Sequence, residues 1–380
     1  MEGLIPFCAK CALLLPYRHR AGWRRSCCSM PMKLIHRLIG SLIAAAALAG
    51  AAHAQNVRIL GRSDPVPTGG FAIQWPSSGF EATFDGPTLK ATIFDWGSNW
   101  LNVEIDGKTS PLALEEGSRT YTLFDGAPGR HTIRVTRRTA SNVGITRFEN
   151  VEAAGLHPTS APDHRIMVIG DSFASGFGVE GVNEKCAYSH QTQNADLAFP
   201  ALLGRTFGAD IHVIATDGRG LIRNWTGEDP TMSTLAWQTL PDGATSWTPQ
   251  SYKAQVIVVN LGTNDFTASD PGESFDAAYV FMLRRLRATY PDALIVGSIG
   301  GSLWGKRFAA ARTSISDAID LVRKEGDANV RFVEFKLRSG PGRYGCDYHP
   351  GQRAQIEMAA ALEQEISNSL GWTTTNRAAD

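Results

Sequence analysis

The stretch RIMVIGDS, residues 165–172, joins a short apolar run to a polar end. Its first part is rich in Val and Ile, and Gly-Asp-Ser follows at once. Apolar runs of this kind are typical of strands that are covered on both faces, as in a parallel sheet. Ligands bind beyond the carboxyl ends of such strands. The stretch therefore predicts a buried parallel strand that brings Ser172 to a functional edge.

Similar apolar runs recur from here to the C-terminus, and helical patterns lie between them. The predicted strands are Arg165 to Ile169, Ile211 to Ala215, Val256 to Asn260, Ala293 to Ile299 and Val330 to Phe335. The predicted helices are Leu197 to Phe207, Glu273 to Thr289, Phe308 to Arg323 and Gln352 to Leu370. Strands that alternate with helices predict a doubly wound α/β domain with a five-stranded parallel sheet, over residues 165–380.

Residues 56–155 show another pattern, in which apolar and polar residues alternate over short segments. The predicted strands are Phe71 to Trp75, Phe80 to Phe84, Leu89 to Phe94, Leu101 to Ile105, Thr120 to Leu123 and His131 to Val135. Turn dipeptides such as Asp85-Gly86 separate them. Strands at this spacing predict a small all-β sandwich or jelly roll over residues 55–157. The segment Gly155 to Asp163, with two prolines, is predicted as a linker.

The first 54 residues have the pattern of a leader that ends in a secretory signal peptide. Basic residues after Met32 precede an apolar run to Ala51 and an A-x-A site at 52–54. This order predicts cleavage after Ala54. A membrane anchor is the alternative, but the apolar run from Leu38 is short for a bilayer. We therefore expect a periplasmic or secreted protein with no membrane segment after cleavage.

Charge and cysteine content exclude several classes of function. The chain has 37 Lys and Arg against 37 Asp and Glu, and without residues 1–54 it has 30 basic and 36 acidic residues. A mildly acidic protein is not expected to bind nucleic acid. Without the leader only Cys186 and Cys346 remain, which predicts one disulfide in an exported protein. The histidines are scattered, so neither a metal nor another cofactor is expected. The oligomeric state stays open.

Four polar clusters stand where the sheet's strands end or the last helix begins. They are Gly170-Asp171-Ser172, Asp217-Gly218-Arg219-Gly220, Gly262-Thr263-Asn264-Asp265 and Cys346-Asp347-Tyr348-His349-Pro350. The carboxyl ends of parallel strands meet at one edge of a sheet, so these clusters are expected to converge there.

The residue types in these clusters are those that acyl transfer requires. A serine hydroxyl becomes nucleophilic when an imidazole takes its proton, and a carboxylate can orient that imidazole. We therefore expect Ser172 as nucleophile, His349 as general base and Asp347 as the acid that orients the histidine. The backbone N–H groups of Ser172 and Gly218 and the side-chain amide of Asn264 are expected to form an oxyanion hole. One such donor is worth roughly 3 kcal/mol of the barrier.

These four clusters resemble the SGNH, or GDSL-type, hydrolase superfamily. Residues 186–192, 217–224, 345–350 and 370–372 are similar to segments of family 2 of the carbohydrate esterases. The resemblance implies a β-sandwich followed by an SGNH domain with a flavodoxin-like sheet. It also implies removal of O-acetyl groups from polysaccharides such as xylan, or from their oligosaccharides. Some relatives lack the acid and use a backbone carbonyl instead, whereas the presence of Asp347 favours a full triad here.

Other residues and functions stay open at this point. Trp304 and Trp225 lie in loops after predicted strands, and with Tyr348 they are candidates for contacts to the substrate. His190 is a rival general base, although no carboxylate stands two residues away. An SGNH lipase or thioesterase with a preference for longer acyl chains would use the same catalytic residues. A non-catalytic glycan-binding protein is the other alternative, and an intact triad argues against it.

Overall fold

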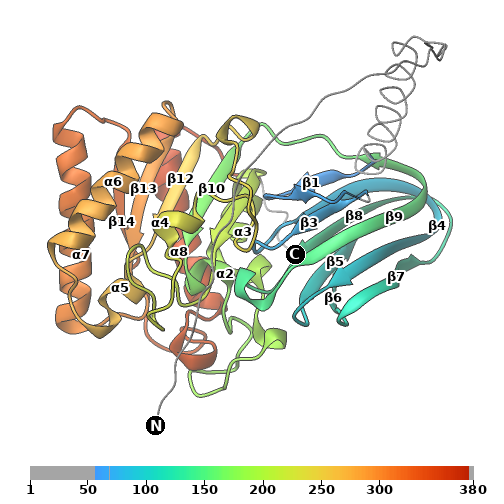
Figure 1. Cartoon of the computed structure of the whole chain (residues 1–380), viewed down its shortest axis with the longest axis horizontal. Coiled ribbons are helices and arrows are strands. Elements are labelled where there is room, and N and C mark those ends of the chain that lie inside the picture. Colours follow the sequence, from blue (N-terminus) through green and yellow to red (C-terminus); the bar gives the residue numbers. More distant parts are fainter. Residues whose placement is uncertain (1–55, 68, 376–380) are drawn as a thin grey trace, which may run out of the picture. The chain divides into compact units, whose positions relative to one another are not determined.

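A computed structural model describes residues 56–67 and 69–375 of the chain, which all belong to one compact unit, residues 47–380. The predicted leader and its cleavage site lie outside the described residues. Figure 1 shows a region of antiparallel strands followed by a region in which strands and helices alternate. Both predicted classes of architecture are therefore present, in the predicted order.

The first region is an antiparallel sheet of nine described strands that folds over a core of its own. The strands are β1 (Arg58–Leu60), β2 (Asp64–Pro65), β3 (Phe71–Ile73), β4 (Gly79–Asp95), β5 (Trp100–Ile105), β6 (Lys108–Ala113), β7 (Gly117–Asp125), β8 (Arg130–Arg137) and β9 (Thr146–Pro158). Their order is β2-β3-β9-β4-β8-β5-β6, and β1 and β7 also pair with β4. Phe71, Phe80 and Phe148 form an aromatic cluster in this core, with ring centroids 5.1–6.4 Å apart.

Two predictions for the β region need correction. Asp85-Gly86 does not end a strand, because β4 continues through it for 17 residues. The predicted linker begins inside β9, which runs through Gly155 to Pro158. Strands β4 and β9 pair with each other, and the register of this pairing shifts on both sides of Asp85. The turn-forming residues lie in these irregular parts of the ladder, so Asp85-Gly86 bends a long strand instead of ending it.

The second region contains a parallel sheet with strand order β11-β10-β12-β13-β14. The strands are β10 (Arg165–Gly170), β11 (Asp210–Ala215), β12 (Val256–Asn260), β13 (Leu294–Ile299) and β14 (Val330–Glu334). The helices are α2 (Ser172–Ser175), α3 (Phe199–Phe207), α4 (Met232–Leu235), α5 (Thr263–Ala268), α6 (Glu273–Thr289), α7 (Gly305–Lys324) and α8 (Gln352–Leu370). The first strand in sequence is second in the sheet, as in flavodoxin-like folds. The predicted fold class is confirmed.

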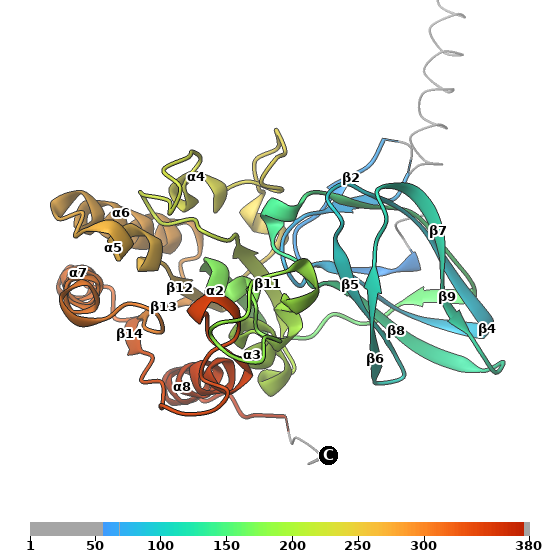
Figure 2. The same ribbon diagram turned by 90° about the horizontal axis from the view of Figure 1, so that it is seen from below.

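Helices cover both faces of the parallel sheet, which explains why its strands are apolar throughout. Met167 and Ile169 of β10 enter a core with residues of α6 and α7. Ile166 and Val168, on the other face, pack with residues of α3 and α8. Figure 2 shows α5 and α6 on one side of the sheet and α3 and α8 on the other. Alternate residues of each strand are therefore buried in different cores.

The β region is anchored to the α/β region by buried side chains. The indole of Trp75 is fully buried and donates a hydrogen bond to the carbonyl of Thr239 at 2.8 Å. The guanidinium of Arg62 is also buried and donates to the carbonyls of Ala236 at 2.8 Å and Gln238 at 2.6 Å. Side chains of the first region thus complete the core of the second.

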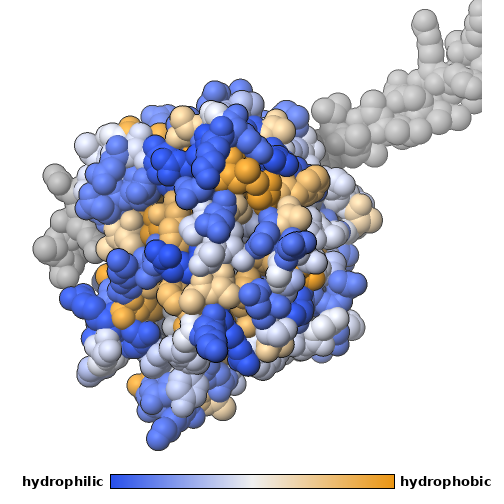
Figure 3. Space-filling model, turned by 90° about the vertical axis from the view of Figure 1, so that its left-hand side faces the viewer, coloured by the Kyte–Doolittle hydropathy of each residue, from blue (hydrophilic) through white to orange (hydrophobic). Residues whose placement is uncertain are grey.

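The outer surface is of mixed polarity. Figure 3 shows the side that carries α6 and α7, where hydrophilic side chains surround separate hydrophobic patches. Phe281 of α6 and Leu321 of α7 are exposed large hydrophobic residues. Among the residues that the structure describes, no helix is long and apolar enough to cross a membrane.

Candidate active site

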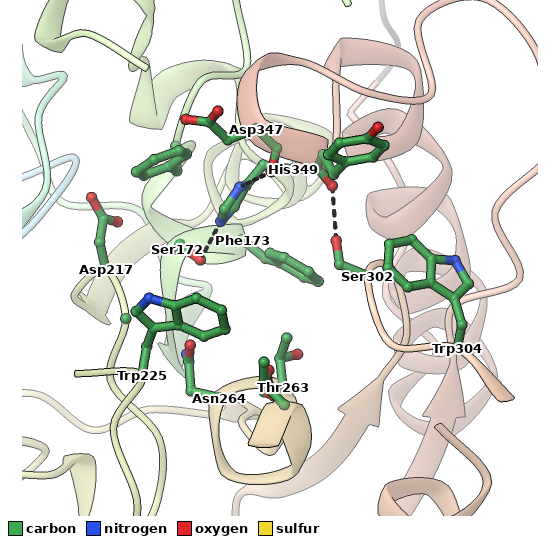
Figure 4. A pocket seen from close by; sticks show the side chains of 14 residues that line it. Ser172, Phe173, Asp217, Trp225, Thr263, Asn264, Ser302, Trp304, Asp347 and His349 are labelled. Atoms are coloured by element: carbon green, nitrogen blue, oxygen red, sulfur yellow. Dashed lines mark hydrogen bonds between the residues drawn. The ribbon is translucent and has the colours of Figure 1, made fainter. Parts of the chain in front are cut away.

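Ser172 and His349 are in hydrogen-bond contact at the carboxyl edge of the parallel sheet. Ser172 begins α2 directly after β10, and His349 follows a short turn that precedes α8. The Nε2 atom of His349 lies 2.9 Å from Oγ of Ser172, as Figure 4 shows. The fold thus joins the predicted nucleophile and the predicted base across 177 positions of sequence.

The carboxylate of Asp347 does not contact the ring of His349. It accepts a hydrogen bond from the backbone N–H of Tyr188 at 3.1 Å, while the carbonyl oxygen of Asp347 lies 3.0 Å from Nδ1 of His349. The backbone of Asp347 is left-handed, with φ 50° and ψ 42°, and Figure 4 shows its carboxylate pointing away from the ring. The predicted contact between acid and base is therefore replaced by a contact to a backbone carbonyl.

The turn that carries the histidine is held by several bonds. Cys346 is joined to Cys186 by a disulfide, as predicted, and its N–H donates to the carbonyl of Gly178 at 2.9 Å. The hydroxyl of Ser302 donates to the carbonyl of Tyr348 at 2.9 Å. Tyr348, like the aspartate before it, has a positive φ, 59°. Left-handed backbone is unfavourable for residues with a side chain, so the turn depends on these bonds to keep its shape. By holding the turn, they also hold His349 in place.

Aromatic rings surround the imidazole of His349. Its centroid lies 4.1 Å from that of Phe177, and Tyr188 stacks on the far side of Phe177 at 4.0 Å. Phe173 meets the imidazole edge to face at 5.7 Å. Loss of water around the ring lowers the pKa of His349 to about 4, although the carbonyl and charge of Asp347 act in the opposite direction. The ring is therefore neutral at pH 7 and can accept the serine proton.

The three predicted oxyanion donors lie in segments that meet beside Ser172. The N–H of Ser172 is the first of α2, where N–H groups have no acceptor within the helix. Gly218 has a φ of 71°, a backbone conformation that favours glycine. A Cβ at this position would fit, so the backbone angle and not the space is what favours glycine here. The side-chain amide of Asn264 donates to the carbonyl of Arg219 at 2.9 Å, next to Gly218. Gly218 and Asn264 both line the cavity described below.

Asp265 fixes the loop that contains one of these predicted donors, Gly218. Its carboxylate accepts hydrogen bonds from the N–H groups of Leu221, Ile222 and Arg223 at 2.8–3.0 Å. The residue before it, Asn264, holds the same loop through Arg219. The sequence Asn-Asp at the start of α5 therefore holds the loop that carries Gly218, one of the predicted oxyanion donors.

Two further carboxylates lie beside the nucleophile with raised pKa values. Burial is the main cause of a pKa of about 7 for Asp171, whose side chain caps α2 by accepting from the N–H of Phe173. Burial also raises the pKa of Asp217 to about 6, although hydrogen bonds from Ser175 and Gln193 oppose this. Asp171 therefore caps the helix that begins with the nucleophile, and its other carboxylate oxygen lies 3.4 Å from the side-chain nitrogen of Asn264.

A cavity of about 680 Å³ opens above Ser172 and His349. Aromatic side chains make up much of its lining, and the sequence-predicted Trp225, Trp304 and Tyr348 are among them. Trp225 and Trp304 stand on opposite sides of the opening in Figure 4. They are 67% and 58% exposed, so their rings are free to meet a ligand. Sequence reasoning missed Phe173, Phe177, Thr263 and Thr267 as lining residues, because no spacing pattern links them.

His190 is not placed to act as the general base. Its Nδ1 lies 3.3 Å from the carbonyl oxygen of Ser98 in the β region, and it does not line the cavity.

Among the described residues, no group of three or more His, Cys, Asp or Glu side chains is arranged to hold a metal ion. The groups that the structure brings together at this site are a serine hydroxyl and a neutral imidazole, with the predicted oxyanion donors in segments beside them.

The strand order and the site together define a hydrolase of the SGNH type. Two family descriptions match the chain, the N-terminal domain of carbohydrate esterase 2 over residues 59–162 and the GDSL-like lipase/acylhydrolase family over residues 168–355. The first match covers the antiparallel sheet and the second covers the catalytic clusters.

Similar proteins agree with this class. An acetylxylan esterase/glucomannan deacetylase from Cellvibrio japonicus is 30% identical over 79% of this chain and 86% of its own length. A cellulase/esterase, CelE, from Acetivibrio thermocellus is 32% identical over 82% of this chain, which spans 39% of that relative. The structure of a family two carbohydrate esterase from Clostridium thermocellum in complex with cellohexaose is 31% identical, covers 83% of this chain and 99% of its own, and has a TM-score of 0.80. The chain belongs to family 2 of the carbohydrate esterases.

Proposed function

We propose that this protein is an exported serine esterase that removes O-acetyl groups from a xylan-like polysaccharide or its oligosaccharides. The contact between His349 Nε2 and Ser172 Oγ, 2.9 Å, carries the proposal. The name of the Cellvibrio relative, acetylxylan esterase/glucomannan deacetylase, supports the substrate class. Because the signal-like pattern of residues 1–54 ends before the β region, we place the enzyme in the periplasm or outside the cell.

The proposed reaction proceeds through an acetyl-enzyme. Ser172 Oγ attacks the acetyl carbonyl and loses its proton to Nε2 of His349, while the carbonyl oxygen of Asp347 holds the opposite side of the ring. The negative charge on the tetrahedral intermediate is stabilised by the N–H groups of Ser172 and Gly218 and by Asn264. His349 then protonates the departing sugar oxygen. Water, deprotonated by the same histidine, releases acetate from the serine.

The aromatic lining of the cavity supports a sugar as the group that carries the ester. A pyranose ring has an apolar face of C–H bonds, and flat indole rings cover such a face well. Trp225 and Trp304 are exposed on opposite sides of the opening and suit this task. In this proposal the β region, residues 55–157, completes the wall of the catalytic domain, residues 165–380.

The experiment compares acetate release from acetylated xylan and from a chromogenic acetyl ester. Wild-type protein should act on both, and Ser172→Ala should act on neither. Ser233→Ala, which removes an exposed serine in α4, is the matched control and should keep full activity. Activity on the chromogenic ester alone, or on longer acyl esters in preference, would point to a lipase or thioesterase. Folded protein that binds xylan without releasing acetate would point to a glycan-binding protein.

A further inference from the structure

The loop between β4 and β5 presents an exposed tryptophan that the catalytic mechanism does not use. Trp96 is 60% exposed, as much as Trp304 in the active-site cavity, and it belongs to the β region. Trp96 does not line that cavity. Covering an exposed indole with an apolar surface lowers the free energy. The residues around Trp96 therefore determine what the indole can bind.

The loop that carries Trp96 has a fixed shape. The carboxylate of Asp95 accepts hydrogen bonds from both the backbone N–H and the side-chain amide of Asn99, each at 2.9 Å. The backbone at Gly97 is so close to the neighbouring segment that a Cβ there would lie 1.7 Å from the carbonyl oxygen of Val143. The indole is therefore presented from a preformed loop, which lowers the entropic cost of binding a ligand.

One side of this loop connects to the wall of the active site. The carbonyl oxygen of Ser98 lies 3.3 Å from Nδ1 of His190. The ring of His190 meets that of Tyr188 at 6.0 Å, and Tyr188 stacks on Phe177 at 4.0 Å. Phe177 in turn packs on the imidazole of His349 at 4.1 Å. A short series of ring contacts thus leads from the loop to the catalytic base.

The other side of the loop connects to a different part of the same wall. Gly97 packs against the segment that contains Gly144. In that segment the hydroxyl of Ser141 donates to the carbonyl of Ala215 at 3.2 Å. Ala215 ends β11 two residues before Asp217, which lines the cavity. Two independent sets of contacts therefore connect the loop to residues that line the cavity, Phe177 and Asp217.

We propose that Trp96 is a distal glycan-binding platform. The polysaccharide that carries the acetyl group in the active site extends toward the β region, and one of its sugar rings stacks on the indole of Trp96. This inference rests on the proposed function and adds a role for the β region. Long substrates reach both the cavity and Trp96, and a second contact on the same chain raises the affinity. Short substrates reach the cavity alone.

The test compares Trp96→Ala with wild type on acetylated xylooligosaccharides of increasing length and on a small chromogenic acetyl ester. For chains longer than about six sugars, kcat/KM should fall roughly fivefold to tenfold, mainly through KM, as expected for one lost stacking contact. The value for the small ester should stay within about twofold of wild type, since that substrate does not reach the platform. Trp96→Tyr, which keeps a flat ring, should restore most of the length dependence.

A matched control and a binding experiment separate this inference from the proposed function. Phe281→Ala removes another exposed aromatic residue, on α6, and should leave all substrates unaffected. In the Ser172→Ala background, Trp96→Ala should reduce retardation by xylan in native gels. If Trp96→Ala keeps the wild-type length dependence, and the double variant is retarded by xylan as much as Ser172→Ala alone, the platform is refuted while the esterase stands. If the wild type itself releases no acetate from any glycan, the proposed function fails, and the platform fails with it.

Discussion

The carbonyl oxygen of Asp347 lies 3.0 Å from Nδ1 of His349, while the carboxylate of the same aspartate faces Tyr188. A carbonyl oxygen accepts a hydrogen bond from Nδ1–H, so it selects the tautomer in which Nε2 is free to take the serine proton. It does so without a hydrogen bond between the ring and the carboxylate. The Asp347 carbonyl orients His349, and the Asp347 carboxylate supplies charge, so mutation of the side chain can distinguish the two effects.

Asp347→Asn should remain active. Asparagine tolerates left-handed backbone, and the carbonyl that contacts His349 remains. We expect kcat/KM to fall less than about tenfold, whereas loss of a triad acid that contacts the ring costs about 10⁴-fold. His349→Ala is the control and should remove nearly all activity. A loss of a thousandfold or more in Asp347→Asn, with unchanged folding, would show that the carboxylate orients the ring during turnover.

The low pKa of His349 predicts activity at unusually acidic pH. Because burial lowers this pKa to about 4, the imidazole stays neutral down to that value and is protonated only below it. We expect kcat/KM for an uncharged ester to stay high down to about pH 5 and to fall tenfold per unit below pH 4. The measurement is a pH profile of kcat/KM over the range in which circular dichroism shows folded protein. A fall already centred near pH 6.5 would contradict the described surroundings of the ring.

Asp171 predicts a pH-dependent stability. Its pKa is about 7 in the folded protein and ordinarily 3.8, so the folded state binds this proton more tightly than the unfolded state does. The resulting stabilisation is complete below about pH 4 and is lost as the pH rises to about 7. Asp171→Asn, which cannot ionise, should therefore gain stability relative to wild type between these values, by roughly 1–4 kcal/mol. Urea unfolding at several pH values measures this, and a pH-independent difference would refute it.

The disulfide between Cys186 and Cys346 should support both stability and activity. It closes a loop across 160 positions and directly precedes the turn that carries His349. Replacing both cysteines by serine should lower the free energy of unfolding by about 2–5 kcal/mol. In the same variant kcat should fall by a larger factor than the factor by which KM changes. The reason is that His349 loses its position while the aromatic walls of the cavity remain. Equal kinetics for the double variant and wild type would show that hydrogen bonds alone hold the turn.

Much of the α/β region could be predicted from the sequence because its pattern is local. The bounds predicted for the helices Glu273–Thr289 and Gln352–Leu370 agree with the structure. The runs of Val and Ile identify strands that are covered on both faces. The β region was harder, because its pairing is long-range. No local signal shows that Asp85-Gly86 lies within one bent strand, since its partner β9 begins about sixty residues later.

The same distinction holds for the site. Ser172 and His349 were predictable because each stands at the end of a strand or before a helix. The role of Asp347 was not, because it depends on the left-handed φ of that one residue. Phe177, which packs on the base, and Trp96, which stands at the side of the β region, have no spacing pattern that marks them. Their roles follow from contacts between segments that are distant in sequence.

The proposed reaction requires an acetyl group on Ser172, and rapid quenching during turnover detects it. Wild-type protein is mixed with excess chromogenic acetyl ester, quenched in acid during the first turnovers and digested for mass spectrometry. We expect one added acetyl group on the peptide that contains Ser172, which disappears once the ester is consumed and is absent from Ser172→Ala. Continued turnover with no acetyl group on Ser172 at any time, or with the acetyl group on another residue, would contradict it.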